Sequence, residues 1–123
     1  MSLNPQETYV ILGTDGAAQA LPGGAQFWER PDGELLQRGE GWLVSEFLFH
    51  QDWPTWEMHP HGDEFVYLLS GEAALYLDEV GGMRIIRLSG TGAVIVPRGV
   101  WHTAKVNISE ANSLVAGKNV LEM

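Results

Sequence analysis

Glycine and proline recur along the whole chain and divide it into short segments. The 123 residues include 15 Gly and 6 Pro, and the stretches between them are rich in Val, Ile, Leu, Phe, Trp and Tyr, which favour strands. Gly or Pro repeatedly interrupts any helical spacing of apolar residues, so only residues 5–10 and 34–38 leave room for a helical turn. Many short strands are typical of a sandwich or a barrel. The sequence therefore predicts an all-β fold.

Ten strands are expected, separated by turns of recognisable chemistry. The expected strands are residues 8–12, 25–28, 42–50, 55–59, 64–69, 73–78, 83–88, 93–96, 101–106 and 113–116. Gly81-Gly82 predicts a hairpin turn between two of them, because glycine adopts positive φ without steric cost. Pro31-Asp32-Gly33 predicts a second turn.

Length and charge limit the classes of function. The length fits one domain over residues 1–123, with a motif-bearing core at about 41–106. The formal net charge of −9 argues against binding to nucleic acid or to an anionic membrane, both of which are recognised by Lys and Arg. The chain has no cysteine, so His, Asp and Glu must supply the ligands of any metal.

The apolar runs are shorter than the roughly 18 residues of a membrane span, and residues 1–7 do not resemble a signal peptide. We therefore expect a cytoplasmic protein of bacterial type.

The segment 64–69 has two largely apolar faces, because alternate residues of a strand point to opposite sides. One face fits the interior of a barrel. The other needs a cover, which a second copy of the chain in a homodimer or residues 8–28 of the same chain would provide.

The sequence between Trp56 and Glu64 concentrates candidate metal ligands. Glu57 and His59 are two residues apart, so they share a face of an extended segment. Glu64 points inward if its face is the interior, and His102 follows a Pro-x-Gly turn. Two carboxylates close together are unfavourable unless a cation lies between them. We therefore expect a divalent metal held by Glu57, His59, Glu64 and His102.

These residues resemble the two motifs of the cupin superfamily. In the first motif, two histidines separated by one residue precede a glutamate, and a glycine follows after six more residues. Glu64 and Gly71 match its second half, and His59 takes the second histidine position. Glu57 stands where the first histidine is usual, and Thr91 stands where the second motif begins with glycine. The run from Pro97 to His102 matches the end of that second motif.

The resemblance implies a small single-domain cupin with a double-stranded β-helix, or jelly-roll, barrel. It also implies a metal with open coordination positions that face a pocket. The spacing to Gly71 favours Glu57, His59 and Glu64 over the alternative pair His59 and His61 with Asp63. A barrel that has lost its metal, with His59 and His102 as structural residues, is a further alternative.

Imidazole and carboxylate together suit Fe, Mn, Ni or Zn. One hypothesis is an enzyme acting on a small polar metabolite, such as a metal-dependent dioxygenase or an isomerase or lyase, with His61 as a candidate for proton transfer. The other is a non-catalytic module that binds or senses a metal or a metabolite. The sequence alone leaves both open.

Overall fold

The computed structural model describes residues 2–29, 41–106 and 112–119, and for 112–119 it defines the backbone alone. Nearly all regular structure in these ranges is strand, which confirms the all-β prediction. The elements are β1 (Thr8–Gly13), β2 (Ala18–Pro22), α1 (Ala25–Trp28), β3 (Gly41–Phe49), β4 (Glu64–Ser70), β5 (Glu72–Glu79), β6 (Gly82–Ser89), β7 (Ala93–Val96), β8 (Trp101–Val106) and β9 (Asn112–Asn119). No helix of the described residues is long and apolar enough to cross a membrane.

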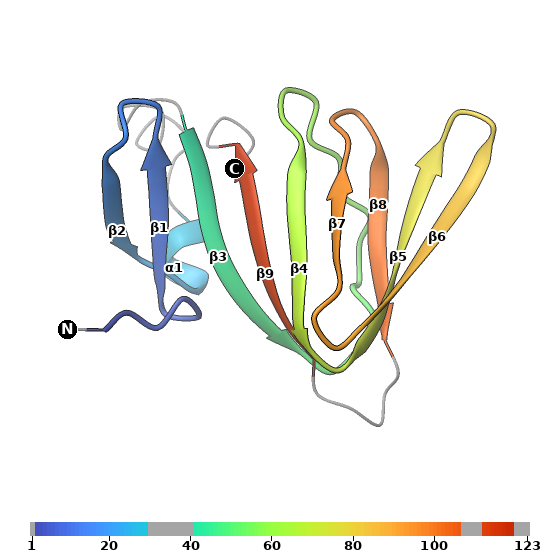
Figure 1. Ribbon diagram of the computed structural model, residues 1–123, viewed down its shortest axis with the longest axis horizontal. Helices are drawn as coiled ribbons and strands as arrows, with labels where there is room; N and C mark the ends of the chain where they lie inside the picture. Colours follow the sequence, from blue (N-terminus) through green and yellow to red (C-terminus); the bar gives the residue numbers. More distant parts are fainter. Residues whose placement is uncertain (1, 30–40, 107–111, 120–123) are drawn as a thin grey trace.

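The described strands form two antiparallel sheets (Figure 1). One has six strands in the order β2-β1-β3-β9-β4-β7, and the other has three in the order β6-β5-β8. Several neighbours in space are distant in sequence: β3 and β4 both pair with β9, and β5 pairs with β8. Such long-range pairing brings motifs from the middle and the end of the chain to one place.

The main core lies between the two sheets and follows from side-chain alternation. Along β4, Val66 and Leu68 are fully buried, whereas Phe65 and Leu69 are exposed. Inward residues of β5, β6, β7 and β8 complete this core. Its buried members are Val66, Leu68, Ala73, Leu75, Leu77, Leu88, Val96 and Ala104. Glu64 has the same parity as Val66, so the start of β4 directs a carboxylate into the same interior.

Two predicted strands are wrong in detail, and one strand was missed. Residues 25–28 form the short helix α1 rather than a strand. Phe27 from α1 is fully buried, with its ring edge-on to that of Tyr9 at 5.0 Å, so packing against β1 sets the local conformation. Residues 55–59 form only one isolated bridge, from Glu57 to His102. β2 was not predicted, because its sequence, AQALP, has little strand character on its own.

The predicted turns had different outcomes. The hairpin between β5 and β6 is present, but its two loop residues are Val80 and Gly81, and Gly82 begins β6. Gly81 has φ of +101°, the conformation for which glycine was expected. Residues 5–7 form a turn, and β1 begins directly after it. The expected features at 31–33 and 34–38 lie outside the described residues.

The outer surface of the six-stranded sheet is apolar. Phe65 and Ile95 lie opposite each other on β4 and β7, and they are 42% and 61% exposed. β1 and β2 extend this sheet sideways instead of crossing it (Figure 1). The idea that residues 8–28 cover this face is therefore wrong for β1 and β2. Leu12 and Trp42, opposite each other on β1 and β3, are themselves exposed.

Candidate metal centre

The candidate centre joins a segment without regular strand structure to the start of β8. Glu57 and His102 exchange two backbone hydrogen bonds, each with an N–O distance of 2.8 Å. The backbone N–H of Gly99 donates to the carbonyl of His59, also at 2.8 Å. These bonds attach residues 57–59 to the second motif, although more than 40 residues separate Glu57 from His102 in the sequence.

A tight turn directs the chain into β8. The Val100 N–H donates to the carbonyl of Pro97, and Gly99 lies in the left-handed region with φ of +80°. A residue with a Cβ would be strained in that conformation, which accounts for glycine at this position. After the turn, His102 enters β8 opposite Leu77 of β5 and points into the interior.

Four side chains meet where these segments converge. One ligand atom each from Glu57, His59 and His102 lies within 4.8 Å of the other two. Glu64, which is not a member of that trio, reaches both imidazoles: Oε1 lies 3.0 Å from Nε2 of His102, and Oε2 lies 3.9 Å from Nε2 of His59. Glu64, His59 and His102 are only 2%, 8% and 0% exposed, whereas Glu57 is partly exposed. Three of the four groups are therefore removed from solvent.

The environment of His102 fixes both its orientation and its charge preference. Its Nδ1 lies 3.1 Å from the carbonyl oxygen of Val100, so Nδ1 must carry the proton that this acceptor receives. Nε2 then faces the Glu64 carboxylate. Burial lowers the pKa of His102, but the hydrogen bonds to Glu64 and to Val100, with the charges of Glu64 and Glu57, outweigh it. The net effect raises the pKa above the usual 6.5, and without a metal the site favours an imidazolium.

The residues present fit a divalent cation. When Nδ1 of a histidine donates to a carbonyl, Nε2 can present its lone pair to a metal, and such outer contacts commonly orient metal-binding histidines. Two ligand atoms about 2.1 Å from one ion are at most about 4.2 Å apart. The ligand atoms of Glu57, His59 and His102 lie within 4.8 Å of one another, so small side-chain shifts would suffice for all three to bind one ion. Either a proton on Nε2 of His102 or a metal ion would balance the negative charge of the Glu64 carboxylate.

The residues of the alternative ligand set lie elsewhere. His61 is exposed and is not part of the trio that the described residues form. Asp63 accepts hydrogen bonds from the backbone N and Nε of Arg98, at 2.9 and 3.2 Å. The backbone and side-chain hydrogen bonds from Arg98 lower the pKa of Asp63, and the slight desolvation of this carboxylate opposes them without cancelling the effect. Asp63 thus links the loop before β4 to the Pro97–Gly99 turn. His50 is also exposed, at the end of β3.

Sequence reasoning missed two contributors to this site. The carbonyl of Val100 orients His102, and the contact between Asp63 and Arg98 connects the two loops. The Pro-x-Gly turn was the available signal for both, since it determines where the following backbone carbonyl points. It does not identify which side chain that carbonyl meets.

The two facing sheets resemble the folds of several known structures. No protein-family model matches the sequence, and neither does any curated protein. An uncharacterised protein with a double-stranded β-helix domain from Klebsiella pneumoniae aligns with a TM-score of 0.54 and 22% identity, over 63% of this chain and 62% of that one. A cupin protein from Bacteroides fragilis gives 0.51 and 14%, over 65% and 64%. Peruvianin-I, a cysteine peptidase from Thevetia peruviana latex, gives 0.57 and 15%, over 63% and 50%.

These comparisons establish the fold. The chain has the double-stranded β-helix fold of the cupins, as its two motifs predict. It spans about half the length of peruvianin-I and less than two thirds of the other two chains. Two further matches are the Fe(II) form of HppE in complex with its substrate and the Co(II) form of HppE. Both have a TM-score of 0.50 and cover 45% of the HppE chain. The Fe(II) form has 19% identity over 63% of this chain, and the Co(II) form has 18% over 64%. At these identities the likeness concerns the fold alone.

Proposed function

We propose that the protein binds one divalent metal ion through Glu57, His59, Glu64 and His102. The observation that carries the proposal is the arrangement of His102, whose Nδ1 is committed to Val100 while Nε2 faces a buried carboxylate. Two imidazoles and two carboxylates form a nitrogen and oxygen donor set with charge −2, which matches Fe(II), Mn(II), Ni(II) or Zn(II). HppE, which shares this fold over 45% of its chain, has Fe(II) and Co(II) forms, and this supports the proposal.

Metal analysis tests the assignment. Protein purified without chelators is expected to contain close to one divalent ion per chain. The variants His59→Ala and His102→Ala should each lose it. His61→Ala and His50→Ala are matched controls, since both side chains are exposed histidines outside the cluster, and they should retain the ion. A site emptied by His61→Ala and unaffected by Glu57→Ala would overturn the ligand set in favour of the pair His59 and His61.

We further propose an enzyme that acts on a small polar metabolite, by dioxygenation or by isomerase or lyase chemistry. A divalent ion in the centre would act as a Lewis acid that polarises an oxygen of the substrate. Glu57 has the most solvent access of the four side chains, so substrate would approach from its side. His61, exposed three residues before Glu64, is the candidate for moving a proton.

A non-catalytic metal-binding or sensing module is the second candidate. The number of candidate ligands supports it, because four protein ligands would fill a tetrahedral sphere and leave no position for a substrate. The two candidates differ in the accessibility of the metal. In Co(II)-loaded protein, added azide should change the visible absorption spectrum if a coordination position is open, as an enzyme requires. An unchanged spectrum would favour the closed, non-catalytic centre.

We also propose a homodimer formed through the apolar outer face of the six-stranded sheet, defined here as Leu12, Trp42, Leu48, Phe65, Leu69 and Ile95. All six side chains are exposed. A second copy is the natural occupant, because a two-fold axis places the same apolar residues on both sides of the contact. Ile95→Glu should produce a monomer in sedimentation equilibrium. Ile85→Glu, at an exposed isoleucine of the other sheet, is the control, and a dimer that survives Ile95→Glu would contradict the proposal.

The remaining features stay predictions. These are a single domain over residues 1–123, a cytoplasmic location, a bacterial source and the nature of the small-molecule partner.

A further inference from the structure

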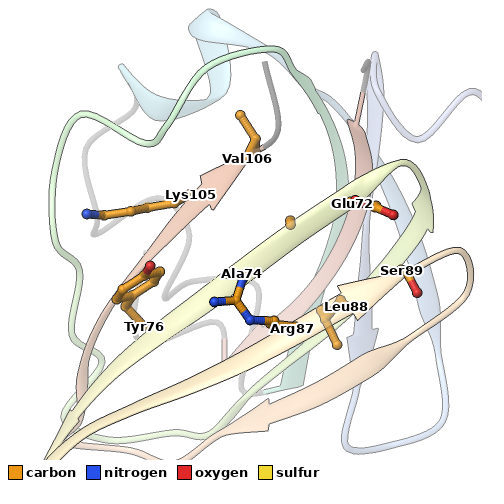
Figure 2. A pocket seen from close by; sticks show the side chains of 9 residues that line it. Glu72, Ala74, Tyr76, Arg87, Leu88, Ser89, Lys105 and Val106 are labelled. Atoms are coloured by element: carbon orange, nitrogen blue, oxygen red, sulfur yellow. The ribbon is translucent and has the colours of Figure 1, made fainter. Parts of the chain in front are cut away.

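A cavity of about 530 Å³ lies against the three-stranded sheet, separate from the metal centre. Its lining residues come from three adjacent strands, β5, β6 and β8 (Figure 2). They are Glu72, Ala73, Ala74, Tyr76, Arg87, Leu88, Ser89, Lys105 and Val106. None of the four candidate metal ligands is among them. Lys105 follows His102 by three residues on β8, so it points to the opposite side of the strand.

The cavity holds two cations that have no carboxylate partner among the described residues. In this part of the chain Arg84 pairs with Glu79 and Arg98 pairs with Asp63. Arg87 and Lys105 form no such pair, and both are exposed. In a chain with net charge −9, positive charge is scarce, so two unpaired cations on one cavity define a distinct local potential.

The register of the sheet places these cations on either side of a small residue. Ala74 of β5 is the partner of Arg87 on β6 and of Lys105 on β8. With neighbouring strands about 4.8 Å apart, the Cα atoms of Arg87 and Lys105 are about 10 Å apart, and both long side chains can reach the space above the Ala74 methyl. A larger side chain at position 74 would fill that space.

Tyr76 extends the site along β5 from Ala74. Its ring lies beneath the ammonium group of Lys105, with Nζ 4.8 Å from the ring centroid, which restrains Lys105 at the edge of the cavity. In Figure 2, Lys105, Tyr76 and Arg87 project from β8, β5 and β6. At the other end of the cavity, Glu72 lies opposite Ser89 and would repel a negative group. The favourable place for an anion is therefore above Ala74.

We propose that this cavity binds a small organic anion, through a carboxylate or phosphate group held between Arg87 and Lys105. Arg87 supplies a planar fork of donors that matches such a group, and Lys105 supplies a point charge. The Tyr76 ring offers an apolar surface for the remainder of the ligand, and the negative charge of Glu72 disfavours a second anionic group at the far end. None of the four candidate metal ligands lines the site, and Lys105 points away from the face of β8 that carries His102.

Titration with two simple probes tests the proposal. Inorganic phosphate and benzoate are added separately to the full chain at about 0.15 M ionic strength, where long-range charge effects are screened. Saturable shifts are expected in the ¹H–¹⁵N resonances of Ala74, Tyr76 and Lys105 with at least one probe. Binding of phosphate alone identifies the ligand class as a phosphate ester, and binding of benzoate identifies an apolar carboxylate.

Matched variants separate a specific site from general attraction. Arg87→Gln and Lys105→Gln should each weaken binding about tenfold, the loss expected for one charge-assisted hydrogen bond. Arg84→Gln removes the same charge from the same strand outside the cavity and should leave the affinity unchanged. All three sites are exposed, so the fold should be retained, and metal content should stay equal to that of the unmodified chain. Shifts that fail to saturate with both probes, or equal weakening by all three variants, would overturn the proposal.

Discussion

The space between the two sheets has an apolar region and a titratable region, although the same strands build both. On β4, Glu64 precedes Val66 and Leu68 with the same parity. On β8, His102 lies opposite Leu77, and Ala104 lies opposite Leu75. Alternation thus directs carboxylate, imidazole and aliphatic groups into one interior. The apolar region is stable through packing, whereas the titratable region needs a proton or a cation to balance its buried carboxylate.

The largest effect on stability is expected in the apolar region. Leu75→Ala removes a fully buried side chain between the sheets and should lower the free energy of unfolding by about 2–5 kcal/mol. Chemical denaturation measures this loss, and the folded protein should keep its metal content. Leu3→Ala, at an exposed leucine before β1 and outside the proposed dimer face, is the control and should change the value by less than about 0.5 kcal/mol. Loss of metal in Leu75→Ala without loss of stability would contradict the separation of the two regions.

Substitution of Glu64 tests the titratable region. Glu64→Gln keeps the shape of the side chain but removes the charge that faces both imidazoles. Metal affinity should fall at least about 10–100-fold, measured by competition with a chelator. Glu79→Gln, which removes a carboxylate paired with Arg84 at the surface, should leave the affinity unchanged. Equal affinities for the two variants would show that Glu64 is not a ligand.

The pH dependence of the metal-free protein distinguishes the two regions further. The raised pKa of His102 means that the folded state binds the proton more tightly than the unfolded chain. Its contribution to stability is therefore fully present below about pH 6.5 and is lost as the pH rises through the folded-state pKa. Metal binding has the opposite dependence and strengthens with pH, because the proton on Nε2 must leave.

Denaturation of chelator-treated protein between pH 5 and 9 measures this contribution. His102→Gln should remove the part of the pH dependence that falls near and above pH 6.5. If the variant and the unmodified chain follow the same profile, the pairing of His102 with Glu64 does not contribute to folding.

The smallest effect is expected at the loop contact between Asp63 and Arg98. Asp63→Asn should lower the melting temperature slightly at neutral pH, since the exposed pair is well solvated. The lowered pKa of Asp63 means that its contribution is present above the usual value of 3.8 and is lost as the pH falls through the folded-state value. The difference between variant and unmodified chain should therefore vanish in acid. Asp78→Asn, at an exposed aspartate of β5, is the control; if it has the same effect as Asp63→Asn, the loop contact has no specific role.

Much of the fold could be predicted because local patterns and tertiary structure agree. Alternation along β4 and the glycines of the turns correctly indicate strands and reversals. The strand predicted for residues 25–28 is a short helix, because the packing of Phe27 against Tyr9 is a tertiary contact that outweighs local propensity. Residues 55–59 have the composition of a strand, yet Glu57 and His102 form only an isolated bridge.

The candidate site was partly accessible to the same reasoning. Motif spacing predicts that His59, Glu64 and His102 lie together, and alternation along the strand predicts that Glu64 points inward; the three side chains are buried and in contact. The spacing did not give the orientation of His102, because that depends on the backbone carbonyl of Val100 after a turn. Motif spacing identifies which residues can meet, and the backbone between them determines how they are oriented.

Crystallography of protein purified without chelators, with anomalous data at the Mn, Fe, Ni and Zn absorption edges, tests the central claim most directly. We predict one anomalous peak per chain, about 2.0–2.2 Å from ligand atoms of Glu57, His59, Glu64 and His102. The claim would be contradicted if no anomalous peak lay between those four side chains. A peak coordinated by His61 and Asp63 would also contradict it.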